Sequence, residues 1–263
     1  HLDFHEQVVN SPYYFAPAAE PFHRVISPWQ RKCQEHIGAN NARWFDARGA
    51  LYFTREVFDL FYPAYGDTWP LFNGAIGMTY EQGGSGRAGR AIMTDLGDTL
   101  TLAYRILNHH EAGLSTVEES ANRAGELVSE FALHHKKNVE APFGMYKGYV
   151  FPAAQDAALM NELRRLLEAN GIEYGTAPAA TSVRCYNYRT GEEAKRNVRK
   201  GDLLVDARQP HSGILQVLMD PDPELSDSMT YDITSWALPH ALGLDAFALL
   251  APLTVEATWP MAD

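Results

Sequence analysis

The most restrictive feature of this sequence is an apolar run that ends in one carboxylate and a glycine-rich loop. Residues 75–80 are mostly apolar, Glu81 follows them, and Gly83 and Gly84 come shortly after. An apolar run bounded by glycines is typical of a buried strand in an α/β sheet. We therefore predict a strand over 75–81 that carries one carboxylate at its end. In a partly desolvated site this carboxylate would have the raised basicity that a general base requires.

A second strand end with polar side chains is expected at the start of the chain. Asp3, His5 and Glu6 flank and follow the apolar Phe4, as at the end of a strand. In α/β enzymes such strand ends are a common place for ligands, although a lone histidine is more often structural.

The chain opens at His1 without Met or a signal-like segment. We therefore expect it to be a piece of a longer protein.

Charge and hydropathy exclude several classes of protein. The chain carries 22 Lys+Arg against 33 Asp+Glu, a net charge of −11, and its one dense basic stretch is 195–200. We therefore expect no nucleic-acid partner. No apolar run approaches the roughly 18 residues that a membrane span requires.

Cys33 and Cys185 form no Cys-x-x-Cys pattern, which leaves either one bridge or two free thiols.

Two familiar motifs are incomplete. Gly84–Gly89 matches G-x-G-x-x-G, but 94–98 would break the helix that a dinucleotide site needs, so a flexible loop is the better interpretation. The second is the metal-binding spacing His-x-x-Glu: none of the ten histidines is followed three residues later by Glu. The pairs His109-His110 and His134-His135 are expected to be solvated residues at helix ends, because adjacent helical side chains diverge.

The remaining pattern predicts an α/β protein of two units. Ser27-Pro28 is a helix start. A helix through 98–111 would bury Leu100, Ala103, Ile106 and Leu107, and a second helix, opened by Ser115-x-x-Glu118, would turn Ala124, Leu127, Val128 and Phe131 inward. Residues 145–151, 154–169 and 172–176 form a βαβ pattern, which favours a parallel sheet. We expect the units to be 1–138 and 139–263.

Several segments of this sequence resemble the zinc carboxypeptidases related to carboxypeptidase A, in particular the bacterial branch with an extra C-terminal domain. The resemblance extends from end to end and is carried by the segments 3–6, 10–17, 52–59, 61–66, Asn73–Gly84 and Tyr231–Pro239. It implies that 1–138 is the C-terminal part of a mixed-sheet α/β catalytic domain. It also implies that 139–263 is an accessory α/β domain resembling the class I glutamine amidotransferase fold.

The resemblance assigns roles to single residues. His5 matches the third zinc ligand, and Glu81 matches the general base and acid that activates zinc-bound water. Tyr62 matches the mobile tyrosine that covers the substrate, with Tyr65 as the alternative. The activity implied is removal of a C-terminal residue from a peptide substrate by a protein outside the cytoplasm or secreted.

The chain departs from the family where the first two zinc ligands belong, since it contains no His-x-x-Glu. A catalytic zinc ion normally has three protein ligands. We therefore expect Zn²⁺ in the intact parent, no tightly bound zinc in this chain, and no activity without the N-terminal half of the catalytic domain. The alternative is a non-enzymatic module that binds peptide or glycan through the accessory domain.

Overall fold

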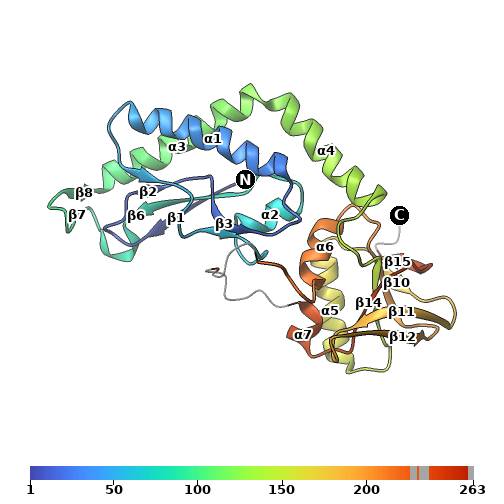
Figure 1. Ribbon diagram of the computed structural model, residues 1–263. Helices are drawn as coiled ribbons and strands as arrows, with labels where there is room; N and C mark the ends of the chain where they lie inside the picture. Colours follow the sequence, from blue (N-terminus) through green and yellow to red (C-terminus); the bar gives the residue numbers. More distant parts are fainter. Residues whose placement is uncertain (226–229, 231–236, 260–263) are drawn as a thin grey trace. The chain divides into compact units, whose positions relative to one another are not determined.

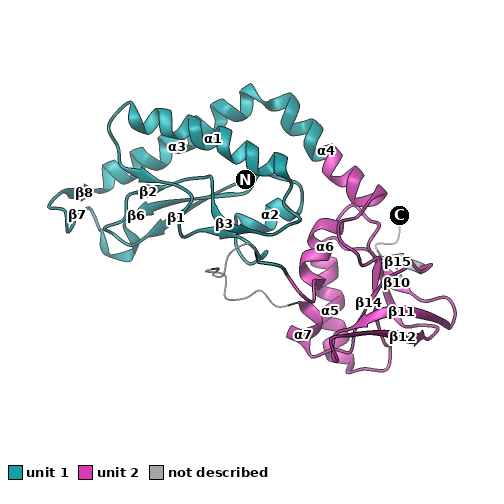
Figure 2. Cartoon of the chain, viewed as in Figure 1, with its two compact units in different colours: residues 1–131, 224–235 teal, residues 132–223, 236–263 magenta. Residues whose placement is uncertain are grey.

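The chain folds into two compact units, each with its own helices and sheet. The computed structural model describes residues 1–225, 230 and 237–259. Unit 1 is His1–Phe131 with Glu224–Ser235, and unit 2 is Ala132–Pro223 with Trp236–Asp263 (Figure 2). The expected α/β class is confirmed. Most of the segment Tyr231–Pro239, including Trp236, lies outside the described residues.

The division between the units falls inside a helix. The helix α4 (Ala124–Glu140) runs through position 138 without a break, so the boundary expected there does not coincide with a change of secondary structure. The contacts change from unit 1 to unit 2 at 131–132, and the segment 224–235 returns to unit 1.

Unit 1 is built on a four-stranded mixed sheet with the order β1-β6-β2-β4 (Figure 1). Strand β6 runs parallel to β1 and antiparallel to β2, and β1 forms one edge of the sheet. The strands of this unit are β1 (Leu2–Gln7), β2 (Tyr13–Tyr14), β3 (Ala19–Phe22), β4 (Tyr52–Phe53), β5 (Asp59–Leu60), β6 (Met78–Gly83), β7 (Ala91–Met93) and β8 (Thr99–Thr101), and its helices before α4 are α1 (Pro28–Asp46), α2 (Thr68–Phe72) and α3 (Leu102–Asn122).

Helix α1 begins as predicted and holds the segment that leads into β6. The Ser27 side chain accepts a hydrogen bond from the Gln30 amide, and the Gln30 side chain accepts one from the Ser27 amide, which completes a capping box. Gln30 Nε2 then donates to the carbonyls of Leu71 and Ala75, at 2.8 and 2.9 Å. Gln34 Nε2 donates to the Gly77 carbonyl at 2.8 Å. Two glutamines of one helix therefore satisfy backbone acceptors just before β6.

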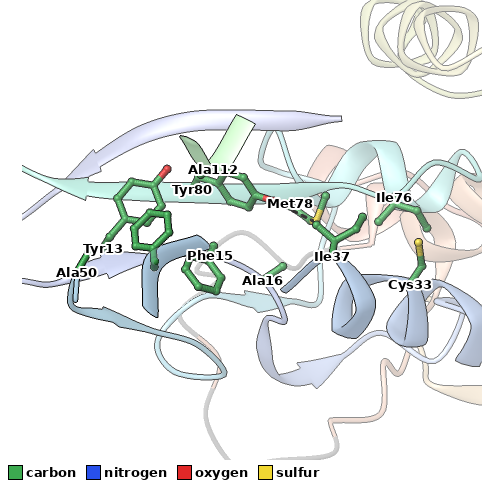
Figure 3. Close-up of a cluster of buried hydrophobic side chains, with 11 residues drawn as sticks. Tyr13, Phe15, Ala16, Cys33, Ile37, Ala50, Ile76, Met78, Tyr80 and Ala112 are labelled. Carbon is green, nitrogen blue, oxygen red and sulfur yellow. Dashed lines mark hydrogen bonds between the residues drawn. The ribbon is translucent and has the colours of Figure 1, made fainter. Parts of the chain in front are cut away.

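The core of unit 1 lies between the sheet and the helices α1 and α3. Figure 3 shows the rings of Tyr13 and Tyr80 from the sheet in one cluster with Ile37 and Cys33 of α1. The buried members of this cluster are Tyr13, Phe15, Ala16, Cys33, Ile37, Phe45, Ala50, Ile76, Met78, Tyr80 and Ala112. A polar network runs through the cluster: Asn41 Nδ2 donates to the Tyr80 hydroxyl at 2.8 Å, and that hydroxyl lies 2.6 Å from Thr116 Oγ1, whereas Asn41 Oδ1 is buried without a partner among the described residues.

The predicted inward face is wrong for the first helix, and for the second helix it holds only at Leu127, which packs against the core of unit 1. Helix α3 continues through Ser115, which is buried and accepts a hydrogen bond from Asn40, so Ser115 does not open a second helix. Ile106 is 59% exposed and Val128 71% exposed. The buried residues of α3 are Arg105, Asn108, Ala112, Ser115 and Thr116. Helix α3 packs against the sheet through polar residues, because Arg105 donates to Glu6 of β1 and Asn108 donates to Gln82 of β6.

Unit 2 contains a seven-stranded sheet with the order β12-β11-β14-β9-β13-β10-β15. Its strands are β9 (Gly148–Phe151), β10 (Tyr174–Thr176), β11 (Thr181–Asn187), β12 (Glu192–Val198), β13 (Leu203–Asp206), β14 (Phe247–Leu249) and β15 (Glu256–Trp259), and its helices after α4 are α5 (Ala157–Ala169), α6 (Ser212–Met219) and α7 (Leu238–Leu242).

The prediction of a parallel sheet in unit 2 is wrong. The expected strand–helix–strand segment is present as β9, α5 and β10, but β13 lies between the two strands and is antiparallel to both. The other neighbouring pairs described in this sheet are antiparallel as well. Strand β13 comes later in the chain, so the local pattern over 145–176 carried no sign of it.

The two cysteines are free thiols in separate cores. Cys33 belongs to the buried cluster of unit 1, and Cys185 belongs to a cluster around Val150, Leu204 and Leu249 in unit 2. This resolves the alternatives that the sequence left open. Burial raises the pKa of the Cys33 thiol to about 11 and raises that of Cys185, so both are poor nucleophiles. Over the helices that the structure describes, length and apolarity fall short of a membrane span.

Candidate functional site

The structure brings together the two residues on which the sequence interpretation depends. Strands β1 and β6 are parallel neighbours, and their register pairs His5 with Glu81. The imidazole Nδ1 lies 3.2 Å from Glu81 Oε2. Glu81 is not the last residue of its strand, because the ladder with β1 continues to Gly83. The two residues, 76 positions apart in the sequence, therefore form one pair on one face of the sheet.

The two side chains of this pair differ sharply in exposure. The Glu81 side chain is 7% exposed and the His5 side chain is 65% exposed. Thr79 lies two residues before Glu81 on the same face of β6, and its Oγ1 is 3.4 Å from Glu81 Oε1. The carboxylate is thus held from within the sheet, whereas the imidazole is open to solvent. This arrangement suits a buried proton acceptor beside an accessible nitrogen ligand.

Burial and charge both act on the protonation of the pair. Burial raises the pKa of Glu81, and the neighbouring His5 and the Thr79 hydroxyl only partly offset this effect. Burial alone would lower the pKa of His5, but attraction to Glu81 and Asp3 outweighs it and leaves that pKa raised. Glu81 therefore holds a proton more readily than an exposed glutamate does.

A further buried carboxyl group lies near this pair and was missed by the sequence analysis. Asp67 is 2% exposed, and burial, reinforced by the charges of Asp3 and Glu81, raises its pKa to about 7. A Cβ on the preceding Gly66 would lie 2.5 Å from Asp3 Oδ2, so the turn passes directly over the Asp3 carboxylate. Asp67 stands in front of the short helix α2, and from the sequence it would be taken for an N-cap.

The candidate tyrosines lie in the turn that delivers Asp67. Tyr62 is half-buried and Tyr65 is 36% exposed, both between β5 and α2. The Tyr65 amide donates to Thr68 Oγ1 at 3.2 Å, so this turn is anchored to the start of α2. The choice between Tyr62 and Tyr65 as the residue that covers a substrate stays a prediction.

A complete metal site does not form from the residues that the structure describes. Among them, no group of three or more His, Cys, Asp or Glu side chains could hold a metal ion. His109 Nδ1 lies 2.8 Å from the Tyr13 hydroxyl, so this ring has a structural partner. His5 supplies one suitable nitrogen, and the donor set that zinc requires does not fit this chain taken alone.

The glycine-rich loop after β6 is held by a buried arginine. The loop contains a 3-10 turn (Ser85–Arg87) followed by β7, and not the helix that a dinucleotide site requires. Arg105 of α3 donates to the Gly89 carbonyl and, at 3.2 Å, to Glu6 Oε1. Arg105 therefore connects the residue after His5 with the loop that follows Glu81, a link between distant segments that no local motif signals.

Comparisons with protein-family models, with curated proteins and with solved structures give no match for this chain.

Proposed function

We propose that this chain supplies His5 and Glu81 to the site of a zinc-dependent carboxypeptidase whose other zinc ligands lie outside it. The observation that supports this proposal is the pairing of His5 with Glu81 across β1 and β6, with 3.2 Å between Nδ1 and Oε2. Metal-assisted hydrolysis needs a carboxylate close to the activated water, and Glu81 lies beside the residue proposed to hold the metal. The substrate would be a peptide, cleaved at its C-terminal bond.

The role of Glu81 follows from its surroundings. Its pKa is raised by burial, so it can take a proton from an attacking water and later give it to the leaving amine. Thr79 Oγ1 lies 3.4 Å from one carboxylate oxygen and 3.4 Å from the Asp3 carbonyl, so it contacts the group from within the sheet. Zinc held by a complete ligand set would lower the pKa of a bound water toward about 7. Tyr62, or alternatively Tyr65, would close over the substrate.

An exposed apolar stripe supports the idea that another polypeptide segment completes this unit. Ile106, Leu107, Leu114 and Val117 recur at helical spacing on α3 and are 59%, 42%, 45% and 64% exposed. Phe4 on the edge strand β1 is 46% exposed and packs edge-on against His109 of α3. Contiguous apolar surface of this kind marks a contact surface. We propose that the N-terminal half of the catalytic domain covers it.

Two finer expectations from the resemblance belong to the same proposal. The intact protein would act outside the cytoplasm or be secreted. Unit 2 would be an accessory domain, and the antiparallel order of its sheet weighs against a parallel amidotransferase-like core. The competing proposal, a peptide- or glycan-binding module without activity, predicts an intact protein that binds no zinc and turns over no peptide.

The decisive experiment replaces Glu81 by Gln in the complete protein. We expect turnover of a peptide substrate to fall by about 10²–10⁴-fold or more, because the proton acceptor is lost. Zinc content, measured by metal analysis, should be unchanged, whereas His5→Ala should lower it. Glu56→Gln, at an exposed position of the same unit, is the matched control and should keep full activity. Near-normal turnover by the Glu81 variant would remove this residue from its proposed role.

A further inference from the structure

A cavity of ≈340 Å³ lies in unit 1 next to β6. Its walls come from the segment 9–13, the β7–β8 hairpin and α3. Gln82 of β6 lines it, and since successive side chains of a strand point to opposite faces, the Gln82 side chain lies on the face opposite Glu81. The volume is within the range of small-molecule sites, about 300–1,000 Å³. The proposed peptidase role makes no use of this cavity.

Two buried amides form a preorganised polar wall of the cavity. Gln82 is 3% exposed and Asn108 is 2% exposed. Asn108 Nδ2 donates to Gln82 Oε1 at 2.6 Å, Gln82 Nε2 donates to the Gly83 carbonyl at 2.9 Å, and Arg48 donates to Asn108 Oδ1. A primary amide has two N–H donors and two acceptor lone pairs, so these oriented groups have capacity for further partners.

A buried hydroxyl at the cavity has no partner among the residues that the structure describes. Thr94 Oγ1 is buried without a hydrogen bond there, and Thr94 lines the cavity. Its backbone is held in the hairpin turn, because the Thr94 amide donates to the Asp98 carbonyl at 2.8 Å and its carbonyl accepts from Gly97 at 3.0 Å. Buried polar atoms are almost always hydrogen-bonded, so this unpaired hydroxyl would gain from a partner at the cavity.

The remaining lining selects the charge and shape of that partner. Asp98 is the one charged side chain among the described residues that line the cavity, and the apolar surface comes from side chains such as Leu96, Leu100 and Tyr104. An anion would meet this carboxylate, and the guanidinium behind the wall, Arg48, is already paired with Glu111 and Asn108. Amides and hydroxyls facing an aromatic ring and aliphatic groups suit a neutral molecule that carries hydroxyls on one side and C–H groups on the other.

We propose that this cavity binds a small neutral polyhydroxyl molecule of the monosaccharide class through Thr94, Gln82 and Asn108. This proposal does not depend on the peptidase function, because the chain itself contains the whole cavity and no metal is involved. Binding would therefore survive the loss of Glu81.

The test is an NMR titration of the ¹⁵N-labelled chain with glucose and N-acetylglucosamine. Glucuronate, which has the same ring with a negative charge, serves as the comparison. We expect the neutral sugars to shift amide signals of the β7–β8 hairpin and α3 with saturation, and glucuronate to bind at least threefold more weakly because it meets the Asp98 carboxylate. Thr94→Val should weaken neutral-sugar binding by about three- to tenfold, the equivalent of one hydrogen bond. Thr181→Val, at an exposed position of unit 2, should leave it unchanged.

A second variant guards against a folding defect of Thr94→Val. Tyr104 is 37% exposed, so Tyr104→Ala should keep the fold while it removes an aromatic face of the cavity. We expect this variant to weaken binding by at least threefold. Absence of saturable shifts with both neutral sugars would overturn the proposal. So would equally tight binding of glucuronate, or binding that neither variant weakens.

Discussion

Asp67 shows how burial acts on a single residue of this chain. Its pKa rises from 3.8 to about 7, chiefly because the carboxyl group is removed from water. The folded state therefore holds this proton more tightly than the unfolded state does. The stabilisation is fully present below the unfolded pKa of 3.8 and is lost as pH rises through about 7.

Replacement of Asp67 by Asn should remove this pH dependence. We expect Asp67→Asn to raise the free energy of unfolding by about 1–3 kcal/mol at alkaline pH and to change it little in acid, because a neutral amide has no charge to bury. Urea unfolding between acid and alkaline pH measures the effect. Asp222→Asn, at an exposed position, is the control. A variant with the same pH profile as the unmodified chain would contradict the assigned burial effect.

The candidate site was predictable from the sequence only in part. Glu81 and His5 each follow apolar residues, a pattern that predicts polar groups at strand ends. Their 3.2 Å pairing depends on the register of β1 and β6, because a shift by one residue would turn one side chain to the other face. The raised pKa of Asp67 depends on groups brought over it by folding, and no pattern around Gly66 and Asp67 indicates this.

At the scale of elements, α3 shows where helical periodicity misleads. Its apolar residues recur at the spacing of a buried face, yet the face turned to the sheet contains Arg105 and Asn108. Apolar periodicity identifies a face that excludes water, but not which neighbour covers it. The exposed stripe is explained if its covering segment lies outside this chain, as proposed.

Ile106→Glu tests that explanation. In the chain alone, we expect the free energy of unfolding to change by less than about 0.5 kcal/mol, because Ile106 is 59% exposed. In the complete protein the same change would bury a charge in the covered stripe and destabilise it by more than about 2 kcal/mol. Denaturant unfolding of both forms measures the difference. Ala112→Leu, at a fully buried position, should cost about 1–3 kcal/mol in either form. Equal effects of Ile106→Glu in the two forms would refute a covering segment at this stripe.

At the scale of the whole molecule, two cores imply two centres of stability. The buried cluster with Ile37 and Tyr80 belongs to unit 1, and the cluster with Val150 and Leu204 belongs to unit 2. A cavity in one cluster removes contacts only from its own set of side chains. Stability should therefore be separable between the units.

Leu204→Ala and Ile37→Ala form a reciprocal test. Each should destabilise its own unit by about 2–5 kcal/mol, because Leu204 is 1% and Ile37 2% exposed. Native-state hydrogen exchange, followed amide by amide, reports the protection of each unit. We expect Leu204→Ala to lower protection in β9 and β13 and to leave β6 unchanged, and Ile37→Ala to do the reverse. Uniform loss of protection across both units would show a single cooperative molecule.

The sequence by itself determined the features that depend on neighbours along the chain. The capping box at Ser27 and Gln30, the course of α5, and the strand that carries Glu81 follow from local hydrogen bonding and apolar spacing. The tertiary structure alone decided that β13 separates β9 from β10, that α3 packs through polar residues, and that His5 contacts Glu81. The physical reason is that pairing and burial are set by segments far apart in the sequence, whose meeting no local pattern records.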